Sequence, residues 1–269
     1  MSVMRAARTA GSLAIQLAAS EAQQNFLGAP WVAGVVNAVP ERVRARTALR
    51  LLSFSPHYFY GRDVRAEAER NRRSRQAIAE ALIAPHLDPR ARVIDYGCGP
   101  GYMARAVAGM AARVDAVDVS RGVLACARVL NGVPGVSYLT PGELARGEGR
   151  ADLAYSFAVV QHMRTEAVKQ ALRLIAAKVR SGGTLLVHFA EPGPEGWRTE
   201  AQWDADQSLA GRVRRRYGLN CFGRTPEEMR DLAAEQGFTG VTVRSLRGQL
   251  KVPGDDDITG QHILIAWRA

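Results

Sequence analysis

The sequence has few of the features that mark secreted or membrane-spanning proteins. It contains three cysteines in 269 residues, and they match no metal-binding spacing: Cys98, Cys126 and Cys221. No stretch reaches the roughly 18 apolar residues that a membrane-spanning helix requires. Residues 1–24 include an Ala/Leu-rich stretch, but polar residues interrupt it, so a cleaved signal peptide is disfavoured. Together these absences predict a cytoplasmic protein with reduced thiols and no bound metal.

Lysine is also scarce, because the basic residues are almost all arginine. The chain has 36 lysines and arginines against 26 acidic residues, which gives a net charge of +10 at pH 7. Such a charge is compatible with an anionic partner. The arginine clusters at 70–75 and 212–216 are not interleaved with aromatic residues, as a platform for stacked bases would be. We therefore expect no nucleic-acid partner, whereas an anionic small-molecule substrate fits the charge.

Glycine is concentrated where a ligand could approach the backbone. Residues 93–104 read VIDYGCGPGYMA, an apolar run that ends in Asp95 and continues into a turn and a helix start. The turn has a glycine at every second position: Gly97, Gly99 and Gly101. Without side chains there, a ligand can lie against the turn and the first N–H groups of the helix. The next predicted strand, 113–119, carries Asp118 at its tip, where a carboxylate can bind a ribose diol, so the pattern predicts an adenosine-type ligand.

The details of the turn distinguish between nucleotide ligands. A dinucleotide fingerprint is G-x-G-x-x-G, but its sixth position is here Tyr102, which argues against a nicotinamide enzyme. The Gly-Lys-Ser/Thr of a phosphate-binding loop is also absent. A phosphate-free ligand such as S-adenosylmethionine fits better, with Asp95 orienting its ammonium group directly or through water.

The chain resembles the class I S-adenosylmethionine-dependent methyltransferases in four ordered segments. They are the first motif at 95–101, the ribose acid Asp118, and the segments 151–157 (ADLAYSF) and 179–187 (VRSGGTLLV). The resemblance covers about residues 70–269 and implies an α/β, Rossmann-like, doubly wound seven-stranded sheet, mostly parallel with one antiparallel edge strand. It also implies S-adenosylmethionine as the cofactor. The residues implied to contact it are Asp95, Gly97, Cys98, Gly99, Gly101, Asp118 and Val119, with backbone groups of Ser156 and Phe157 at its methionine end.

The order of apolar and polar patterns agrees with that fold. The predicted strands cover 92–95, 113–119, 136–139, 151–157, 184–190, 241–250 and 262–267. The predicted helices cover 63–87, 101–110, 120–130, 165–179 and 225–236, and such alternation indicates a mostly parallel sheet. Residues 1–62 are interpreted as a helical extension or lid, with helices at 6–19 and 45–52. Residues 63–269 are interpreted as the cofactor-binding domain, with an insertion at 191–224.

Histidines near the carboxyl edge of the sheet are the candidate catalytic residues. His162 follows the strand 151–157 and is the predicted general base, because imidazole titrates near neutral pH and this loop borders the ligand crevice. In some similar methyltransferases a histidine at this position acts as a base, and in others it only packs or caps. His188 is the rival, although a hydrogen-bonded core histidine is the favoured interpretation. Glu191 could orient a histidine or bind a substrate hydroxyl. The residues predicted to contact adenine are Gly142, Glu143 and Leu144.

Aromatic residues flank the predicted site in the sequence. The cluster 57–60 could form a lid or pack the extension onto the domain. The insertion could shape the acceptor pocket, pack as a helix pair or form an oligomer contact. Its aromatic residues are Trp197, Trp203, Tyr217 and Phe222. The acidic run 255–257 reads as a solvated turn rather than a metal site.

The expected reaction is methyl transfer to a small molecule, at a hydroxyl of a sugar, polyketide or phenol, or at a carboxylate. The Asn-Pro-Pro-Tyr/Phe motif associated with methylated bases and glutamines is absent after the strand 151–157. Transfer to nitrogen is the alternative. A further alternative is a member of the same fold that binds the cofactor without methylating. The sequence leaves the acceptor and the oligomeric state open.

Overall fold

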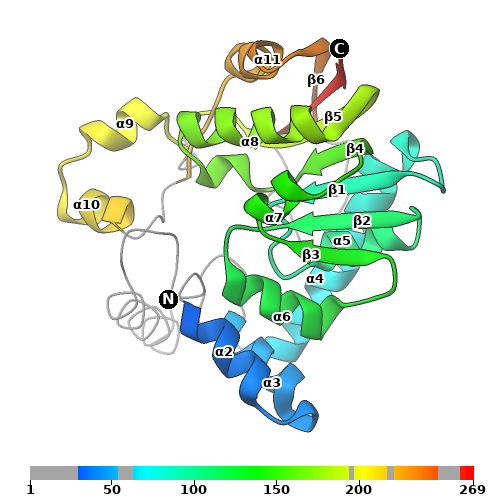
Figure 1. The fold of residues 1–269 in the computed structure, drawn as a ribbon. Coiled ribbons are helices and arrows are strands. Elements are labelled where there is room, and N and C mark those ends of the chain that lie inside the picture. The colour runs from blue at the N-terminus through cyan, green and yellow to red at the C-terminus, as the bar shows by residue number, and fades with distance from the viewer. Residues whose placement is uncertain (1–29, 54–62, 194–196, 217–220, 248–260) are drawn as a thin grey trace.

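The computed structural model describes residues 30–53, 63–193, 197–216, 221–247 and 261–269, which build a seven-stranded sheet with helices around it (Figure 1). The strands are β1 (Arg92–Tyr96), β2 (Arg113–Val117), β3 (Val136–Leu139), β4 (Ala151–Ser156), β5 (Val179–Ala190), β6 (Phe238–Ser245) and β7 (Gln261–Arg268). Their order is β3-β2-β1-β4-β5-β7-β6. β1 to β5 are parallel, and β7 runs antiparallel to both of its neighbours. The predicted Rossmann-like sheet is confirmed, and its reversed strand β7 lies one place in from the edge strand β6.

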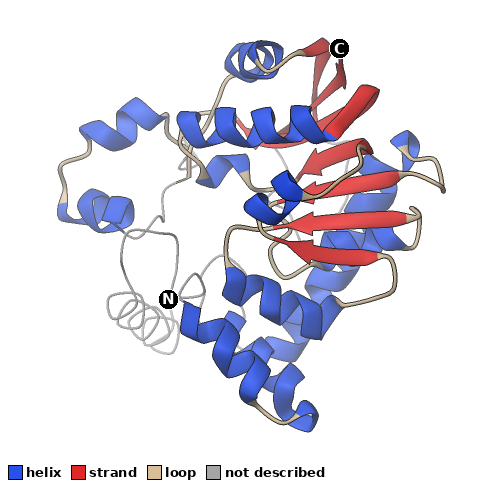
Figure 2. Ribbon diagram, viewed as in Figure 1, coloured by secondary structure: helices blue, strands red, loops and turns tan. Residues whose placement is uncertain are grey.

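Helices cover both faces of the sheet in two layers (Figure 2). One layer holds α4 (Val64–Ile78), α5 (Tyr102–Ala108) and α6 (Arg121–Asn131), and the other holds α7 (Pro141–Arg146), α8 (Thr165–Lys178) and α11 (Pro226–Glu235). Each layer buries its own apolar core: Met103 belongs to the first, and Leu172 to the second. The neighbouring β1 residues Val93 and Ile94 belong to opposite cores, as the two-residue period of a strand requires.

Two N-terminal helices, α2 (Pro30–Ala38) and α3 (Glu41–Leu52), pack on the outer side of α6 through a third apolar cluster. The extension is therefore helical where the structure describes it. Pro40 separates α2 from α3, and Pro30 is the first residue of α2, where the missing N–H costs no hydrogen bond. The predicted helix at 6–19, the aromatic cluster 57–60, Tyr217 and the acidic run 255–257 lie outside the described residues.

Several predicted boundaries move, for identifiable reasons. β2 ends at Val117 because Asp118 bends the chain, its carboxylate accepting the Ser120 N–H. The predicted helix at 63–87 is α4, continued by the π-helical turn η2 (Ala79–Ile83) and the 3-10 turn η3 (Ala84–His86). α7 is absent from the predicted elements because it opens with Pro141 and a glycine, which are typical of turns, whereas a capping box stabilises it as a helix.

None of the helices that the structure describes is both long enough and apolar enough to cross a lipid bilayer.

Candidate active site

The glycine turn lies at the carboxyl end of β1, between β2 and β4, where the strand order reverses. In an open α/β sheet this position is the usual ligand crevice. All three glycines have left-handed backbones: φ is +83° at Gly97, +51° at Gly99 and +84° at Gly101. A Cβ at Gly97 would collide with the Val159 side chain, and one at Gly101 with the Tyr138 hydroxyl. The turn therefore requires glycine for both its conformation and its packing.

Hydrogen bonds from neighbouring elements fix the turn. Asp118 Oδ2 accepts the Gly99 N–H at 3.0 Å, and its Oδ1 accepts the Ser120 N–H at 2.8 Å. Asn131, fully buried at the end of α6, donates from Nδ2 to the Pro100 carbonyl at 2.7 Å. Sequence reasoning missed Asn131, because a polar residue at a helix end carries no signal of a partner 31 residues away.

Asp95 is the buried acid that precedes the turn. The residue is 2% exposed, and its Oδ2 has no hydrogen-bond partner. Burial raises the pKa of Asp95 to about 7; the Tyr155 hydroxyl opposes this rise, and the Asp118 carboxylate adds to it. Ser156, the last residue of β4, likewise has a buried hydroxyl without a partner. Nine buried side-chain polar atoms of the described residues lack a partner, and these two lie at the carboxyl ends of β1 and β4, beside the glycine turn, where a polar ligand would satisfy them.

His188 stabilises the turn that leaves β4. Ala158 has a left-handed backbone, with φ of +58°, which is unusual for a residue other than glycine. Its N–H donates to His188 Nδ1 at 3.2 Å, and the Phe157 ring stacks on the His188 ring with centroids 4.1 Å apart. Burial lowers the pKa of His188 to about 3, so the imidazole stays neutral. The interpretation of His188 as a hydrogen-bonded core histidine is confirmed.

His162 ends a 3-10 turn, η4 (Val160–His162), that follows β4. The residue before this turn, Val159, is the one that packs against Gly97, so η4 adjoins the glycine turn. His162 Nδ1 lies 3.7 Å from Cys221 Sγ, near the far end of the insertion. Burial raises the pKa of the Cys221 thiol, which therefore stays protonated beside the imidazole.

The other predicted residues occupy varied environments. Val119 is 57% exposed, whereas Cys98 is buried within the turn, where burial raises the pKa of its thiol well above the usual range. Glu191 Oε2 lies 3.8 Å from His262 Nε2, so the histidine beside it is neither candidate base. Glu143 accepts hydrogen bonds from the Thr140 N–H and hydroxyl at the start of α7, and these bonds lower the pKa of its carboxyl. Among the described residues, no cluster of three or more His, Cys, Asp or Glu could hold a metal ion.

Comparison with known proteins identifies the family of this chain. A family model described as a methyltransferase domain matches residues 65–243, more than half of the chain. The chain belongs to the class I S-adenosylmethionine-dependent methyltransferases.

Two solved methyltransferases share the fold of this methyltransferase at low identity. Magnesium protoporphyrin IX methyltransferase from Synechocystis PCC 6803, solved with bound S-adenosylmethionine, is 18% identical, with a TM-score of 0.52 over 86% of this chain and 99% of that chain. Human N-acetylserotonin methyltransferase, also in complex with S-adenosylmethionine, is 15% identical, with a TM-score of 0.51 over 98% of this chain and 67% of that chain.

A curated relative matches a shorter part of this methyltransferase. The ribosomal protein L11 methyltransferase of Thiobacillus denitrificans (strain ATCC 25259 / T1) is 36% identical over 131 residues, which are 45% of this chain and 42% of that protein. The chain therefore matches less than half the length of that relative.

The insertion of this methyltransferase returns to the sheet beside η4 and holds that turn in place. The Phe222 N–H donates to the Gln161 carbonyl at 2.6 Å. The Arg224 guanidinium, on a residue that is 4% exposed, donates to the Val160 carbonyl at 2.8 Å and to the Met163 carbonyl at 2.5 Å. Sequence reasoning missed Arg224, because a single arginine after a glycine does not reveal that its side chain is buried.

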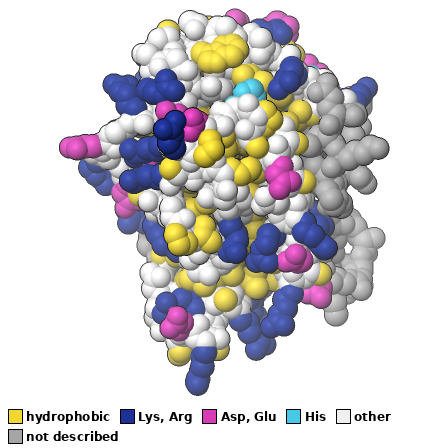
Figure 3. Space-filling view, turned by 90° about the vertical axis from the view of Figure 1, so that its right-hand side faces the viewer, with side chains coloured by type: hydrophobic (Ala, Val, Ile, Leu, Met, Phe, Trp, Pro, Cys, Tyr) yellow, Lys and Arg dark blue, Asp and Glu magenta, His cyan; other side chains and the backbone are white. Residues whose placement is uncertain are grey.

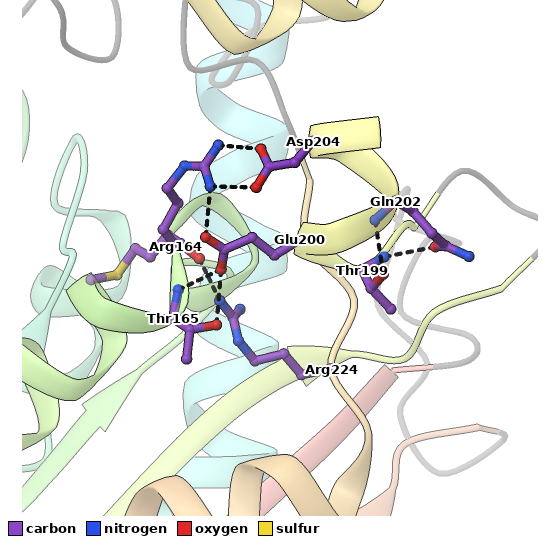
Figure 4. A network of polar contacts seen from close by, with 8 residues as sticks. Arg164, Thr165, Thr199, Glu200, Gln202, Asp204 and Arg224 are labelled. Carbon is purple, nitrogen blue, oxygen red and sulfur yellow. Dashed lines mark hydrogen bonds and ion pairs between the residues drawn. The ribbon is translucent and has the colours of Figure 1, made fainter. Parts of the chain in front are cut away.

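The insertion also caps α8, through the short helix α9 (Glu200–Ala205), as Figure 4 shows. The N-cap residue of α8, Arg164, makes no side-chain capping bond of its own. Glu200 Oε2 instead accepts the Thr165 N–H at 2.8 Å and the Thr165 hydroxyl at 2.9 Å, while its Oε1 accepts from Arg164 at 2.7 Å. Arg164 also pairs with Asp204 through both of its terminal nitrogens. The insertion thus holds the connection from β4 to α8 at η4 and again at the start of α8.

Two predicted aromatic residues of the insertion pack in its interior. Trp203 is 2% exposed, and its indole N–H donates to the Cys221 carbonyl at 2.8 Å. Phe222 is 5% exposed. The guanidinium of Arg198 lies 4.8 Å from the Trp203 ring centroid, and that of Arg214, on α10 (Leu209–Arg216), lies 5.6 Å from it. Of the interpretations of the insertion, structural packing accounts for these two rings.

Replacing Arg224 with Met should loosen η4 without changing the glycine turn. Two buried carbonyls lose their donor, so we expect the free energy of unfolding to fall by about 2 kcal/mol. Affinity for S-adenosylmethionine should change less than about two-fold, because Arg224 contacts none of the predicted cofactor residues. Denaturant unfolding and calorimetric titration measure the two quantities. Arg224→Lys, which keeps one donor group, should recover part of the stability; a variant as stable as the parent would contradict the role given to these bonds.

Proposed function

We propose that this methyltransferase transfers a methyl group from S-adenosylmethionine to a hydroxyl oxygen of a small molecule. The observation that carries the proposal is the buried, unpartnered Oδ2 of Asp95 at the edge of the glycine turn. A carboxylate in that position suits a cationic group, and the methionine end of S-adenosylmethionine carries an ammonium. The cofactor supplies a methyl group already activated by the sulfonium, so the protein mainly has to position the reactants and exclude water.

The residues proposed to bind the cofactor lie in the glycine turn and at the carboxyl ends of β1, β2 and β4. Asp95 binds the ammonium directly or through water, and the backbone of residues 97–101, including Cys98, faces the nucleoside. Asp118 binds the ribose diol, and the exposed Val119 lies beside the adenine. Backbone groups of Ser156 and Phe157 bind the methionine end. The partnerless buried Oγ of Ser156 supports this placement, because a polar ligand there would satisfy it.

His162 is proposed as the general base for a hydroxyl acceptor. An imidazole titrates near neutral pH and can take the hydroxyl proton as the methyl group is transferred. The thiol of Cys221 stays protonated, so it does not compete for that proton. His188 is unsuited to the role, because its Nδ1 accepts the Ala158 N–H and its imidazole is buried.

The insertion and the N-terminal extension are proposed to close the acceptor side. Figure 1 shows α9 and α10 beyond the carboxyl ends of the parallel strands, where loops usually set specificity. Arg212 and Arg214 are exposed on α10, which supports an anionic acceptor. We assign residues 1–62 to an extension and 63–269 to the methyltransferase domain. The three unpaired cysteines support a cytoplasmic enzyme, and we assign this enzyme to small-molecule biosynthesis.

A protein acceptor is the second candidate. It is favoured by the 36% identity, over 131 residues, to a protein named ribosomal protein L11 methyltransferase. If the acceptor were an amine of that protein, nitrogen would be the methylated atom, and a base at His162 would matter less, since an amine can attack once it is deprotonated in solution.

Release of S-adenosylhomocysteine from S-adenosylmethionine tests the proposal. The purified chain is assayed against phenols, sugars, polyketides, carboxylates, amines and ribosomal protein. We expect turnover with an oxygen acceptor and a rate that depends on His162. Turnover confined to amines or to protein would contradict the oxygen assignment. Tight cofactor binding without turnover on any class would favour a non-methylating member of the fold.

Replacing Asp118 with Ala should weaken cofactor binding by roughly 1–3 kcal/mol, because the ribose hydroxyls lose a charged partner. The Gly99 N–H would lose its acceptor as well. Calorimetric titration with S-adenosylhomocysteine measures the change. Asp115→Asn serves as the control: this carboxylate sits in the middle of β2 and pairs with Arg92 and Arg113, so affinity should stay close to that of the parent. Unchanged affinity in Asp118→Ala would remove the ribose assignment.

A further inference from the structure

The α2–α3 pair has an inner and an outer face with different chemistry. Its inner face packs on α6 and is fully buried: Val32, Val36, Ala48 and Leu52. On both helices the residues opposite this buried face point away from the domain. The chemistry of these outward side chains determines what the pair can bind.

The exposed side of α2 is largely apolar. The helix reads PWVAGVVNA and contains no charged residue. Trp31 is 49% exposed and Val35 is 37% exposed, and Val43 on α3 is also 37% exposed. A surface helix of a globular protein normally presents charged or polar residues on this side. Trp31 and Val35 flank the buried stripe of Val32 and Val36, so the apolar character of α2 extends from its packed face onto its exposed side.

The outward side of α3 adds a row of positive charge. Arg42, Arg46 and Arg50 recur every four residues, so they lie on one face of the helix, and all three are exposed. Within the described part of the chain, no carboxylate pairs with any of them. Like charges at this spacing repel one another and destabilise the helix, so the row is costly without an anionic partner.

On the neighbouring helix α4, arginines are paired with acidic residues. On α4, Arg70 pairs with Glu67 at 2.9 Å, and Arg72 pairs with Glu69 at 2.8 Å. An arginine-rich composition therefore does not by itself leave arginines without partners. Figure 3 shows Lys and Arg side chains at the base of the molecule, with acidic side chains among them.

We propose that this outer face (Trp31, Val35, Arg42, Val43, Arg46 and Arg50) docks on an anionic membrane surface. Anionic headgroups supply the charge that the arginine row lacks, and the region between headgroups and acyl chains accepts tryptophan and valine. A nucleic acid would satisfy the arginines but would leave the apolar side chains in water. The helices lie on the membrane and do not cross it. Docking goes beyond the proposed methyl transfer and brings the enzyme to a lipid surface.

Vesicle flotation of the full chain tests the proposal. Vesicles of phosphatidylcholine alone are compared with vesicles that also contain phosphatidylglycerol. We expect binding to the anionic vesicles, loss of binding at high salt, and little binding to the neutral ones. Equal binding to both vesicle types, or none to either, would overturn the proposal. So would capture of an RNA oligomer or polyglutamate by a chain that leaves anionic vesicles unbound.

Two matched triple variants locate the surface. Removal of the row by Arg42→Gln, Arg46→Gln and Arg50→Gln should weaken vesicle binding at least about 10-fold. The control removes the same charge from exposed arginines on and beside α7 and α8, by Arg146→Gln, Arg150→Gln and Arg173→Gln. Its binding should stay within about two-fold of the parent. Equal losses in both variants would show that net charge alone is responsible, and would contradict the assigned face.

Fluorescence supplies a readout that does not depend on charge. Tryptophan emission should shift to shorter wavelength when the parent binds anionic vesicles, and Trp31→Phe should bind but lose most of that shift. An unchanged shift in Trp31→Phe would contradict insertion of this face. Circular dichroism and cofactor titration of each variant confirm that the fold and the active site are intact.

Discussion

Asp95→Asn should stabilise the cofactor-free protein and sharply weaken cofactor binding. The carboxylate is buried and one oxygen has no partner, so the neutral amide avoids the cost of a buried charge at pH 8. The same amide cannot pair with the ammonium of S-adenosylmethionine. We expect affinity to fall by roughly 2–3 kcal/mol, about 30- to 150-fold. Thermal unfolding and calorimetric titration of one sample measure both effects.

The stability and the cofactor affinity of the parent should both depend on pH through Asp95. Burial raises the pKa of Asp95 to about 7 from its ordinary value of 3.8, so the folded state holds a proton that the unfolded state has lost between these values. The stability that this group contributes is present below about pH 4 and is lost as the pH rises through about 7. Cofactor binding needs the ionised carboxylate, so affinity should rise between about pH 6 and pH 8 in the parent and stay flat in Asp95→Asn.

Asp152→Asn is the matched control, because both oxygens of its carboxylate have partners, whereas Oδ2 of Asp95 has none. Oδ2 of Asp152 accepts the Arg92 N–H at 2.8 Å, and Oδ1 accepts from Arg180 at 2.7 Å. This substitution should destabilise the protein and leave cofactor affinity close to that of the parent. An Asp95→Asn variant that binds S-adenosylmethionine as tightly as the parent would contradict the assignment of Asp95 to the ammonium.

His162→Ala should lower turnover on an oxygen acceptor by roughly 100-fold, with little change in cofactor affinity. The imidazole takes the hydroxyl proton, so its loss slows the chemical step and leaves the glycine turn intact. The pH profile should change as well: in the parent, turnover should rise as a group near neutral pH loses its proton, and this rise should disappear in the variant. Steady-state rates and cofactor titration separate the two effects.

Two control variants test whether the loss of turnover is specific to His162. Cys221→Ser removes the thiol 3.7 Å from His162 Nδ1 and should keep most of the turnover, since that thiol stays protonated. His86→Ala, in η3 at the far end of α4, removes a histidine outside the site and should leave the rate unchanged. A near-normal rate in His162→Ala would make His162 a packing residue and would favour an amine acceptor.

The sequence predicted the parts of the structure that rest on local signals. Strand β3 and the cap of α11 follow from nearby residues: Thr225 caps the helix and Pro226 takes its first position. The glycine turn was also predictable, because positive φ and close packing leave no alternative to glycine. The order of the strands followed from family-like motifs, which residue patterns alone would not give.

The parts that the sequence did not reveal depend on long-range contacts. Asn131 reaches back to Pro100, and Arg224 reaches back to Val160, so each partner lies tens of residues away. Glu200 stabilises α8 from 35 residues away, where the local sequence offers no capping side chain. Local patterns set which elements form, whereas contacts of this kind set how the active-site turns are held.

A crystal structure of the chain with S-adenosylhomocysteine tests the central claim most directly. We expect the nucleoside against Gly97–Gly101, the amino group of the homocysteine end bonded to Asp95 Oδ2 directly or through a water, and the ribose hydroxyls at Asp118. A nucleoside bound elsewhere, or a glycine turn that touches no part of it, would contradict the account.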